Sequence, residues 1–219
     1  RDCPSGAIIC GLEILMRNNL FKFGDTFWIQ KEGTAMGTPP APNYATLYFG
    51  IHEMDIAPLF REMLAAYFRY IDDCLALWIH HPDPLVDAQN LAAFKEAMNS
   101  YGKLTWEFTP LSQSVDLLDL TLEITESGIQ PKLFEKELNL YLYIPPHSAH
   151  SPGVLRGLVI GMMLRILRLT TALQDKKTAL RSFFFRLCNR GYAAKKLWKL
   201  FVEALAHTER PTSTRNDLR

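Results

Sequence analysis

Hydrophobic residues recur with a helical period in some stretches of the chain and as short runs in others, which predicts a mixture of helices and strands. Helical spacing predicts helices over residues 5–20 and 84–102, the second of them ended by Gly102. A further helix is predicted from Ala41, with Pro42 in the first turn, where a missing N–H costs little.

The short apolar runs predict strands. Residues 21–30 are expected to form a hairpin about a Gly-Asp turn, and residues 66–80 a second hairpin. Asp72 and Asp73 are placed at the turn of the second hairpin, because adjacent acidic residues are poor in strand interiors. Further strands are predicted over residues 103–110, 115–125 and 132–144.

The sequence changes character near residues 145–153. The residues that follow, 154–206, are basic, contain no proline and predict a small helical bundle with its best break at Gly191. The predicted class is therefore α+β, followed by an all-helical part. The predicted parts are residues 1–144, a connector at 145–152, the helices at 153–206 and a tail at 207–219.

The net charge of +1 hides an asymmetry between the two halves of the chain. Residues 1–130 contain 8 basic and 17 acidic residues, whereas residues 131–219 contain 16 basic and 6 acidic ones. A basic half joined to an acidic half predicts that the basic part binds a polyanion. A solvated basic helix face is the alternative.

The four cysteines show no CxxC spacing, which favours free thiols in a reducing, intracellular compartment. Arginines interrupt the most apolar stretch, residues 153–169, and its longest uncharged run is far shorter than a membrane span needs. His147 and His150 have a spacing that zinc ligands use, but no cysteine lies nearby, which disfavours zinc.

The pair Asp72-Asp73 lies in the stretch FRYIDDCLALW, with aromatic and aliphatic residues on both sides. Two like charges beside apolar strands are costly unless a cation meets them. Mg²⁺ prefers oxygen ligands and needs only a few carboxylates besides water and substrate phosphates. We therefore predict Mg²⁺ at this turn, with Mn²⁺ as a substitute. A solvated Asp-Asp turn is the alternative.

A loop rich in glycine and proline, GTAMGTPPAP at residues 33–42, precedes the acid pair. Gly33 and Gly37 allow the backbone to approach a ligand closely, and the helix after the loop would point its first N–H groups toward phosphates. The loop lacks the GxxxxGK[ST] spacing of nucleoside triphosphatases. Taken alone, such a loop is more often a simple connection.

These stretches together resemble the palm of a reverse transcriptase, and more narrowly that of the Penelope-like retroelement reverse transcriptases. The segment before the family's catalytic hairpin resembles NLFKFGDTFWIQKEGTAMGTPPAPNYATLYFG, and its third catalytic motif resembles RYIDD. Its primer grip resembles LLDLTLEI, and its thumb resembles HSAHSPGVLRG, LRILRLTT and FFFRLCNRGY. The resemblance covers most of residues 8–195. It implies an antiparallel palm sheet with helices on one face, followed by a helical thumb.

The resemblance also implies roles for single residues. Asp72 and Asp73 would be catalytic and would bind the metal ions. The other implied residues are Met36, Gly37 and Pro42 for the nucleotide, and Tyr70, Leu118, Asp119, Arg165 and Arg168 for primer and template. Lys103 is a weaker candidate for donating a proton to pyrophosphate, with an ordinary surface lysine as the alternative. For the two arginines the alternative is a solvated helix edge.

The implied activity is RNA-directed DNA synthesis by two-metal nucleotidyl transfer. Its partners would be an RNA template, a DNA primer and deoxynucleoside triphosphates, with no membrane and a nuclear location. The family carries a further catalytic aspartate on a strand before the Gly/Pro-rich loop, and no such motif is found before residue 8. We therefore expect a missing N-terminal portion of the polypeptide to supply it, and these residues alone to be inactive.

A non-catalytic nucleic-acid-binding remnant of a retroelement protein is the alternative from another functional class. It would bind through the thumb, with salt-dependent affinity and without synthesis. A decayed element without function is a third possibility. An RNA-dependent RNA polymerase is a fourth, although its hairpin more often reads Gly-Asp-Asp.

Overall fold

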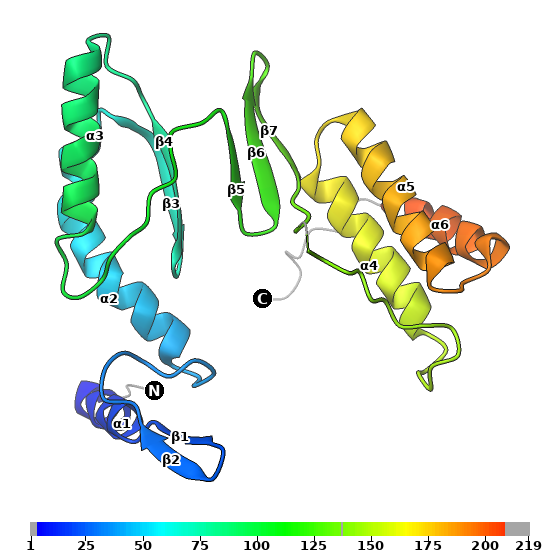
Figure 1. The fold of residues 1–219 in the computed structure, drawn as a ribbon, viewed down its shortest axis with the longest axis horizontal. Helices are drawn as coiled ribbons and strands as arrows, with labels where there is room; N and C mark the ends of the chain where they lie inside the picture. The colour runs from blue at the N-terminus through cyan, green and yellow to red at the C-terminus, as the bar shows by residue number, and fades with distance from the viewer. Residues whose placement is uncertain (1–3, 137, 209–219) are drawn as a thin grey trace. The chain divides into compact units, whose positions relative to one another are not determined.

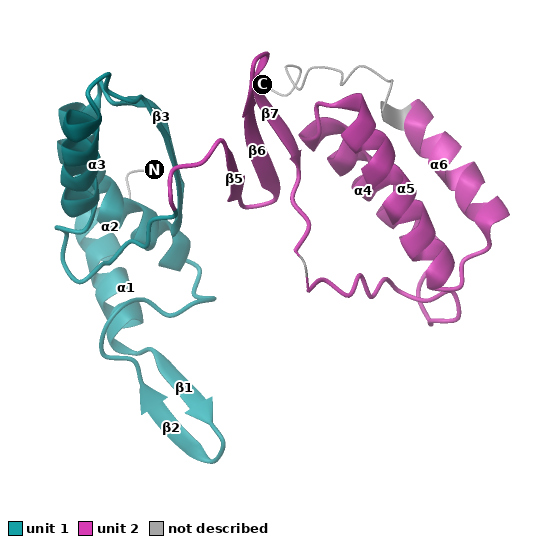
Figure 2. Cartoon of the chain, turned by 45° about the horizontal axis from the view of Figure 1, so that its top comes forward, with its two compact units in different colours: residues 1–109 teal, residues 110–219 magenta. Residues whose placement is uncertain are grey.

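The structure is a computed structural model that describes residues 4–136 and 138–208. The chain forms two compact units, residues 1–109 and 110–219 (Figure 2). The α+β class is confirmed, since helices and antiparallel strands alternate along the chain. Cys3 and most of the predicted tail lie outside the described residues. Within those residues, no helix has the length and hydropathy that crossing a bilayer requires.

Unit 1 follows the predicted order of elements, with shorter bounds. Its elements are α1 (Ser5–Arg17), β1 (Leu20–Phe23), β2 (Thr26–Ile29), α2 (Ala41–Ile56), the 3₁₀ turn η1 (Ala57–Phe60), β3 (Leu64–Tyr70), β4 (Asp73–Trp78) and α3 (Pro84–Met98). Both predicted hairpins are confirmed, and α2 begins at Ala41 as predicted. Helix α3 ends earlier than predicted, at Met98, and Gly102 occupies a left-handed position in the loop that follows.

Helices α2 and α3 cover one face of the β3–β4 hairpin (Figure 1). The buried side chains between them come from α2, η1 and α3, and are Phe49, Ile56, Phe60, Phe94 and Met98. Inward-facing strand residues, among them Tyr67 and Trp78, pack against this core. Since each large apolar side chain contributes about 1.5–3 kcal/mol when buried, the core fixes the hairpin against the helices.

The predicted strand over residues 103–110 is wrong. Trp106 and Phe108 from this stretch pack against the core of unit 1. The Trp106 backbone N–H donates to Asn99 Oδ1 at 2.5 Å, so a side chain takes the place of a neighbouring strand. The alternation of apolar residues therefore reflects packing of an irregular segment.

Unit 2 combines a three-stranded antiparallel sheet with three helices. Its elements are β5 (Ser114–Leu117), β6 (Leu120–Thr125), β7 (Gly128–Leu133), α4 (Val154–Leu169), α5 (Leu173–Asn189) and α6 (Ala194–Thr208). The buried bundle core consists of Val159, Met163, Ile166, Phe183, Leu187, Leu197, Phe201 and Ala204.

The predicted strand over residues 132–144 is wrong beyond Leu133, where β7 ends. The stretch that follows gives its carbonyl groups to side chains of unit 2. Arg190 Nε donates to Tyr143 O at 2.6 Å, and Tyr192 Oη donates to Ile144 O at 2.7 Å. These bonds satisfy two carbonyl groups at the end of the stretch without a further strand.

The sheet of unit 2 belongs with the helices, and the two units divide between residues 109 and 110, so the connector expected at 145–152 lies inside unit 2. Two hydrogen bonds fasten β7 to the end of α4. Thr171 N–H donates to Pro131 O at 3.0 Å, and Leu133 N–H donates to Thr170 Oγ1 at 3.3 Å. Contacts between residues so far apart in sequence produce no local sequence pattern from which they could be predicted.

The predicted break at Gly191 is confirmed. Gly191 has a φ of 98° and its N–H donates to Cys188 O at 2.9 Å. The Tyr192 N–H donates to Leu187 O at 3.2 Å, which completes a Schellman motif at the end of α5. Helix α6 therefore follows α5 after a short turn, residues 190–193.

We predict that Asp87 contributes to stability in a pH-dependent way. Its carboxylate accepts from His80 Nδ1 at 2.8 Å, from the His81 N–H at 3.0 Å and from Trp78 Nε1 at 2.9 Å. These bonds, that of His80 foremost, lower the pKa of Asp87 to about 2. A lowered folded-state pKa stabilises the fold above the unfolded-state value, and this contribution is lost as pH falls toward 2.

Asp87→Asn should therefore lower the melting temperature at about pH 5, and the difference from the unmodified chain should vanish near pH 2. Circular dichroism melting curves of both proteins at the two pH values measure this. A difference of the same size at both pH values would contradict the role of the ionised carboxylate.

Candidate functional site

The acid pair lies at the end of the β3–β4 hairpin. Tyr70 and Asp73 are cross-strand partners, so the two residues of the turn are Ile71 and Asp72. The structure thus places Asp72 in the turn, as predicted, but Asp73 at the start of β4. Residues 71–73 form what we name the acid turn. The side chains of both acids are exposed, and neither makes a hydrogen bond or an ion pair within the described residues.

Ile71 adopts a conformation that residues of its type rarely occupy. Its φ is 56°, in the left-handed region. For a side chain branched at Cβ this costs about 1–2 kcal/mol. The favoured two-residue hairpin turns require a positive φ at this position, so the turn itself imposes the conformation on Ile71.

Arg69 holds the turn from within unit 1. Its side chain is only 6% exposed, and Nη1 donates to Ile71 O at 3.1 Å. Nη2 donates to Thr46 O at 2.9 Å. Nε and Nη2 donate to the two carboxylate oxygens of Glu53 at 2.6 and 2.7 Å. The guanidinium also lies over the Phe49 ring, 5.4 Å from its centroid.

The charge of Glu53 is preserved despite its burial. Burial is the largest single influence and raises the pKa of Glu53, but the hydrogen bonds from Arg69 and Tyr67, together with the charges of Arg69 and His52, outweigh it, so the pKa is lowered. Tyr67 Oη donates to Glu53 Oε1 at 2.7 Å. The hydrogen bond to Glu53 in turn raises the pKa of Arg69. The pair is therefore ionised at neutral pH.

A pocket of about 730 Å³ opens beside Asp72 within unit 1. This volume lies in the range of small-molecule pockets, about 300–1,000 Å³. Aromatic side chains form much of its wall, and charged groups lie around them. Its lining includes Gly33, Thr34, Tyr44, Tyr48, Ile71, Asp72, Lys103 and Trp106.

Lys103 lies in the same pocket lining as Asp72, although the two are far apart in sequence. Its Nζ forms an ion pair with Glu32 Oε1 at 2.7 Å. Both side chains are largely exposed, so the pair is worth about 0–1 kcal/mol. A phosphate group that entered the pocket could therefore replace Glu32 as the partner of the ammonium.

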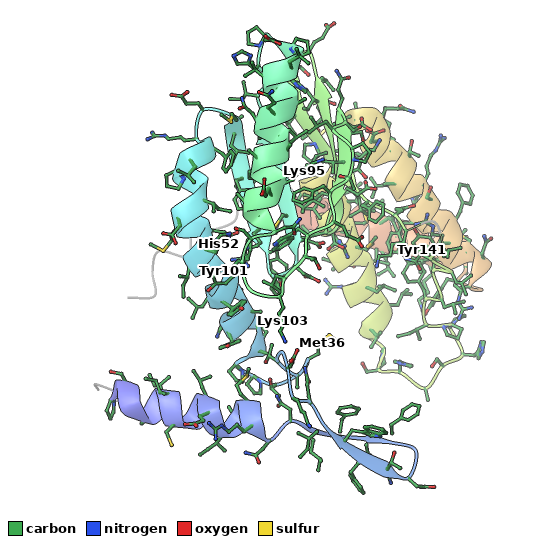
Figure 3. All side chains as sticks on the ribbon, turned by 60° about the vertical axis from the view of Figure 1, so that its left-hand side comes forward. Met36, His52, Lys95, Tyr101, Lys103 and Tyr141 are labelled. Atoms are coloured by element: carbon green, nitrogen blue, oxygen red, sulfur yellow. The ribbon has the colours of Figure 1, made fainter. Side chains whose placement is uncertain are left out.

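The three residues predicted to contact the nucleotide lie outside this lining. Met36, labelled in Figure 3, is fully exposed. Gly37 and Pro42 are also exposed. The same loop contributes Gly33 and Thr34 to the pocket instead. Tyr70 is exposed at the end of β3, beside the acid turn.

The residues predicted for primer and template in unit 2 are partly brought together. The predicted strand 115–125 is broken by a turn at Leu118 and Asp119, which line a pocket of about 230 Å³ with Arg165. Arg165 Nη2 forms an ion pair with Asp119 Oδ2 at 2.5 Å, so its charge already has a partner. Arg168 is exposed on α4 and lies outside this pocket.

Strained backbone marks both pockets. Among the described residues, the non-glycine residues with positive φ are Ile71, Leu118 and Tyr141. Ile71 lines the pocket of unit 1, and the other two line the pocket of unit 2. Ile71 and Leu118 are each the first residue of a two-residue hairpin turn, and the favoured turns of this length require a positive φ at that position. Turn geometry therefore accounts for two of the three conformations.

Sequence reasoning missed the aromatic wall and the buried ion pair. Tyr44 and Tyr48 are four residues apart in a helix that was predicted, so their shared face could have been found. The pairing of Glu53 with Arg69 had no such signal, because it joins two elements through tertiary structure.

Of the two acids predicted to bind Mg²⁺, only Asp72 lines the pocket. Asp72 and Asp73 offer two oxygen donor groups, and Mg²⁺ bound with substrate phosphates takes one or two carboxylates from the protein. In the part of the chain that the structure describes, no group of three or more His, Cys, Asp or Glu side chains could hold a metal ion. Water, phosphate or a further acid would have to complete the coordination.

Residues 142–201 match the family described as "Animal helix-turn-helix domain". The match spans α4, α5 and the first half of α6, which is less than half of the chain. Comparison with curated proteins and with solved structures gave no match. The short turn between α5 and α6 agrees with a helix-turn-helix connection.

We predict that Gly102, which precedes Lys103 at the pocket, does not tolerate a side chain. Its φ is 60°, and a Cβ there would lie 2.5 Å from Tyr48 Oη. Gly102→Ala should lower the free energy of unfolding by about 1–3 kcal/mol. Urea denaturation measures this change.

Tyr48→Phe removes the clashing oxygen, so the penalty of Gly102→Ala should be smaller in that background. Gly37→Ala is a matched control, because Gly37 also has a positive φ but has no atom within 4 Å of an added Cβ. An equal penalty with and without the Tyr48 hydroxyl would contradict the proposed clash.

Proposed function

We propose that unit 1 is part of the palm of a Penelope-like reverse transcriptase, and that the acid turn belongs to an RNA-directed DNA polymerase core. One observation carries the proposal. Asp72, in a strained two-residue turn, shares an aromatic-lined pocket with Lys103 and with the Gly33-Thr34 part of the Gly/Pro-rich loop. A two-residue hairpin turn by itself requires a positive φ at its first residue, but it does not require the pocket.

In this proposal the substrates are a deoxynucleoside triphosphate and a DNA primer on an RNA template. Asp72 and Asp73 would hold Mg²⁺, with Mn²⁺ as a substitute. Bound metal would lower the pKa of the attacking primer hydroxyl and neutralise charge on the leaving pyrophosphate.

The residues of the chain itself would bind and orient the nucleotide. Tyr44, Tyr48 and Trp106 would shield it from water, and positioning of this kind supplies much of the rate of phosphoryl transfer. Lys103 would exchange Glu32 for the triphosphate and neutralise its charge. Tyr70 stands beside the turn and would contact the primer end.

A second candidate function is nucleic-acid binding by α5 and α6 without catalysis. The first two turns of α6 carry the exposed residues Lys195, Lys196 and Lys199, with no acid in the first turn. Trp198 among them is 66% exposed. In helix-turn-helix proteins the second helix inserts its N-terminal residues into the major groove, and lysines there neutralise phosphates. The family match over residues 142–201 favours this candidate.

We predict that Asp72→Asn separates the two functions. In the complete polypeptide that carries these residues, the variant should reduce Mg²⁺-dependent primer extension on RNA by about 10²-fold or more, because a neutral amide is a poor metal ligand. Its affinity for nucleic acid should be unchanged. Asp55→Asn is the matched control, since Asp55 is exposed on α2 and outside the pocket.

Full synthesis by the Asp72 variant would refute the polymerase proposal. Binding without any synthesis by the unmodified polypeptide would favour the second candidate.

For the second candidate, Lys195→Gln and Lys199→Gln should each weaken binding to DNA or RNA of any sequence. Each should also reduce the slope of log affinity against log salt by about 1, because one fewer phosphate is neutralised. Fluorescence anisotropy over a range of salt concentrations measures the slope. Lys95→Gln makes the same charge change on α3 in unit 1 and should leave the slope as it is. Equal slopes for all these proteins would contradict a binding role for α6.

A further inference from the structure

We propose that Arg69 is a positioning residue for the acid turn. Its hydrogen bonds to Glu53 and Thr46 fix its side chain on α2, and its hydrogen bond to Ile71 O then fixes the turn. The proposed role in metal binding rests on the proposed polymerase function. The mechanical role, which is to fix the backbone at Ile71 and Asp72, is independent of that function.

The contacts of Arg69 join two elements at one point. Its hydrogen bond to Ile71 O, at 3.1 Å, reaches the residue directly before Asp72. Its bonds to Thr46 O at 2.9 Å and to Glu53 at 2.6 and 2.7 Å reach α2. The acid turn is thus tied to the helix that follows the Gly/Pro-rich loop and contributes Tyr44 and Tyr48 to the pocket.

The position of the Ile71 contact distinguishes this arrangement from an ion pair that only stabilises the fold. A structural pair would need only the two bonds to Glu53. The additional bond reaches the one residue of the hairpin that is held in the left-handed region. The two-residue turn requires this conformation, which is costly for a side chain branched at Cβ, and the guanidinium adds a contact that holds it.

Lysine cannot replace this set of bonds. The planar guanidinium offers several N–H groups in a fixed fork, which here bond to three different residues. A lysine ammonium is a compact charge that could keep Glu53 paired but could not also reach Thr46 O and Ile71 O in the same geometry. Arg69→Lys therefore keeps the buried charge and removes the positioning.

Unit 2 contains a matched control for this substitution. Arg186 donates to the two carboxylate oxygens of Glu135 at 2.7 and 2.6 Å, and it lies over the Tyr141 ring at 3.4 Å from the centroid. Like that of Arg69, this pair is bidentate and lies over an aromatic ring, although Arg186 bonds through Nη1 and Nη2 and Arg69 through Nε and Nη2. Arg186→Lys should therefore remove a comparable bidentate ion pair and leave the acid turn of unit 1 unchanged.

The test compares four forms of the full chain: unmodified, Arg69→Lys, Arg186→Lys and Glu53→Gln. Mn²⁺ affinity is measured by electron paramagnetic resonance, and binding at the turn is defined as that which Asp72→Asn with Asp73→Asn removes. Hydrogen exchange of the backbone amides of residues 70–74 is measured in the same samples. Melting temperatures show that each variant is folded.

We expect Arg69→Lys to weaken Mn²⁺ binding at the turn by about 10-fold, the lower end of what loss of a ligand-orienting contact costs. Exchange at residues 70–74 should be faster, while Arg186→Lys matches the unmodified chain in both measurements. Glu53→Gln, which keeps the bond to Ile71 O, should lie between them. If Arg69→Lys does not fold, Glu53→Gln is compared with Arg186→Lys instead. Weaker Mn²⁺ binding and faster exchange in Glu53→Gln support the positioning role, and equal values overturn it.

Mn²⁺ affinity and exchange in Arg69→Lys equal to those of Arg186→Lys would overturn the positioning role and leave the polymerase proposal standing. An unmodified chain that binds no Mn²⁺ at the turn would overturn the metal site instead. In that case amide exchange alone decides: faster exchange confined to Arg69→Lys supports the positioning role, and equal exchange overturns it.

Discussion

The ion pair between Arg69 and Glu53 is the interaction on which the candidate site depends. Burying a carboxylate and a guanidinium costs several kcal/mol for each ion, and good geometry with further hydrogen bonds is needed to offset it. Here Tyr67 Oη donates a further hydrogen bond to Glu53. Arg69 donates further hydrogen bonds to the carbonyl groups of Thr46 and Ile71. The same bonds that make the buried charges tolerable also determine where the acid turn lies.

The sequence was sufficient for features that local patterns determine. The hairpin with Asp72 at its turn, the start of α2 at Ala41 and the break at Gly191 follow from turn and capping chemistry. The sequence was insufficient where tertiary contacts determine the conformation of a segment. The stretch around Trp106 alternates like a strand but packs as an irregular segment on the core, with Asn99 replacing a strand partner.

The same division applies to the site. The acid pair and Lys103 were recognisable as residue types, and the structure places Asp72 and Lys103 around one pocket. Met36 is fully exposed and lies outside that pocket, to which the same loop contributes Gly33 and Thr34 instead. The two proposed functions rest on different units. Catalysis would depend on the turn of unit 1, and nucleic-acid binding on the basic start of α6, so each can fail without the other.

The most direct test of the account is to locate where a divalent cation binds. Titration of the isotope-labelled chain with Mn²⁺ broadens the amide signals nearest the ion in a nuclear magnetic resonance spectrum. If a divalent cation binds at the acid turn, the signals of residues 71–74 should disappear first, and excess Mg²⁺ should restore them. Broadening that begins elsewhere, or that is spread evenly over exposed acidic residues, would contradict the claim that the acid turn is a metal site.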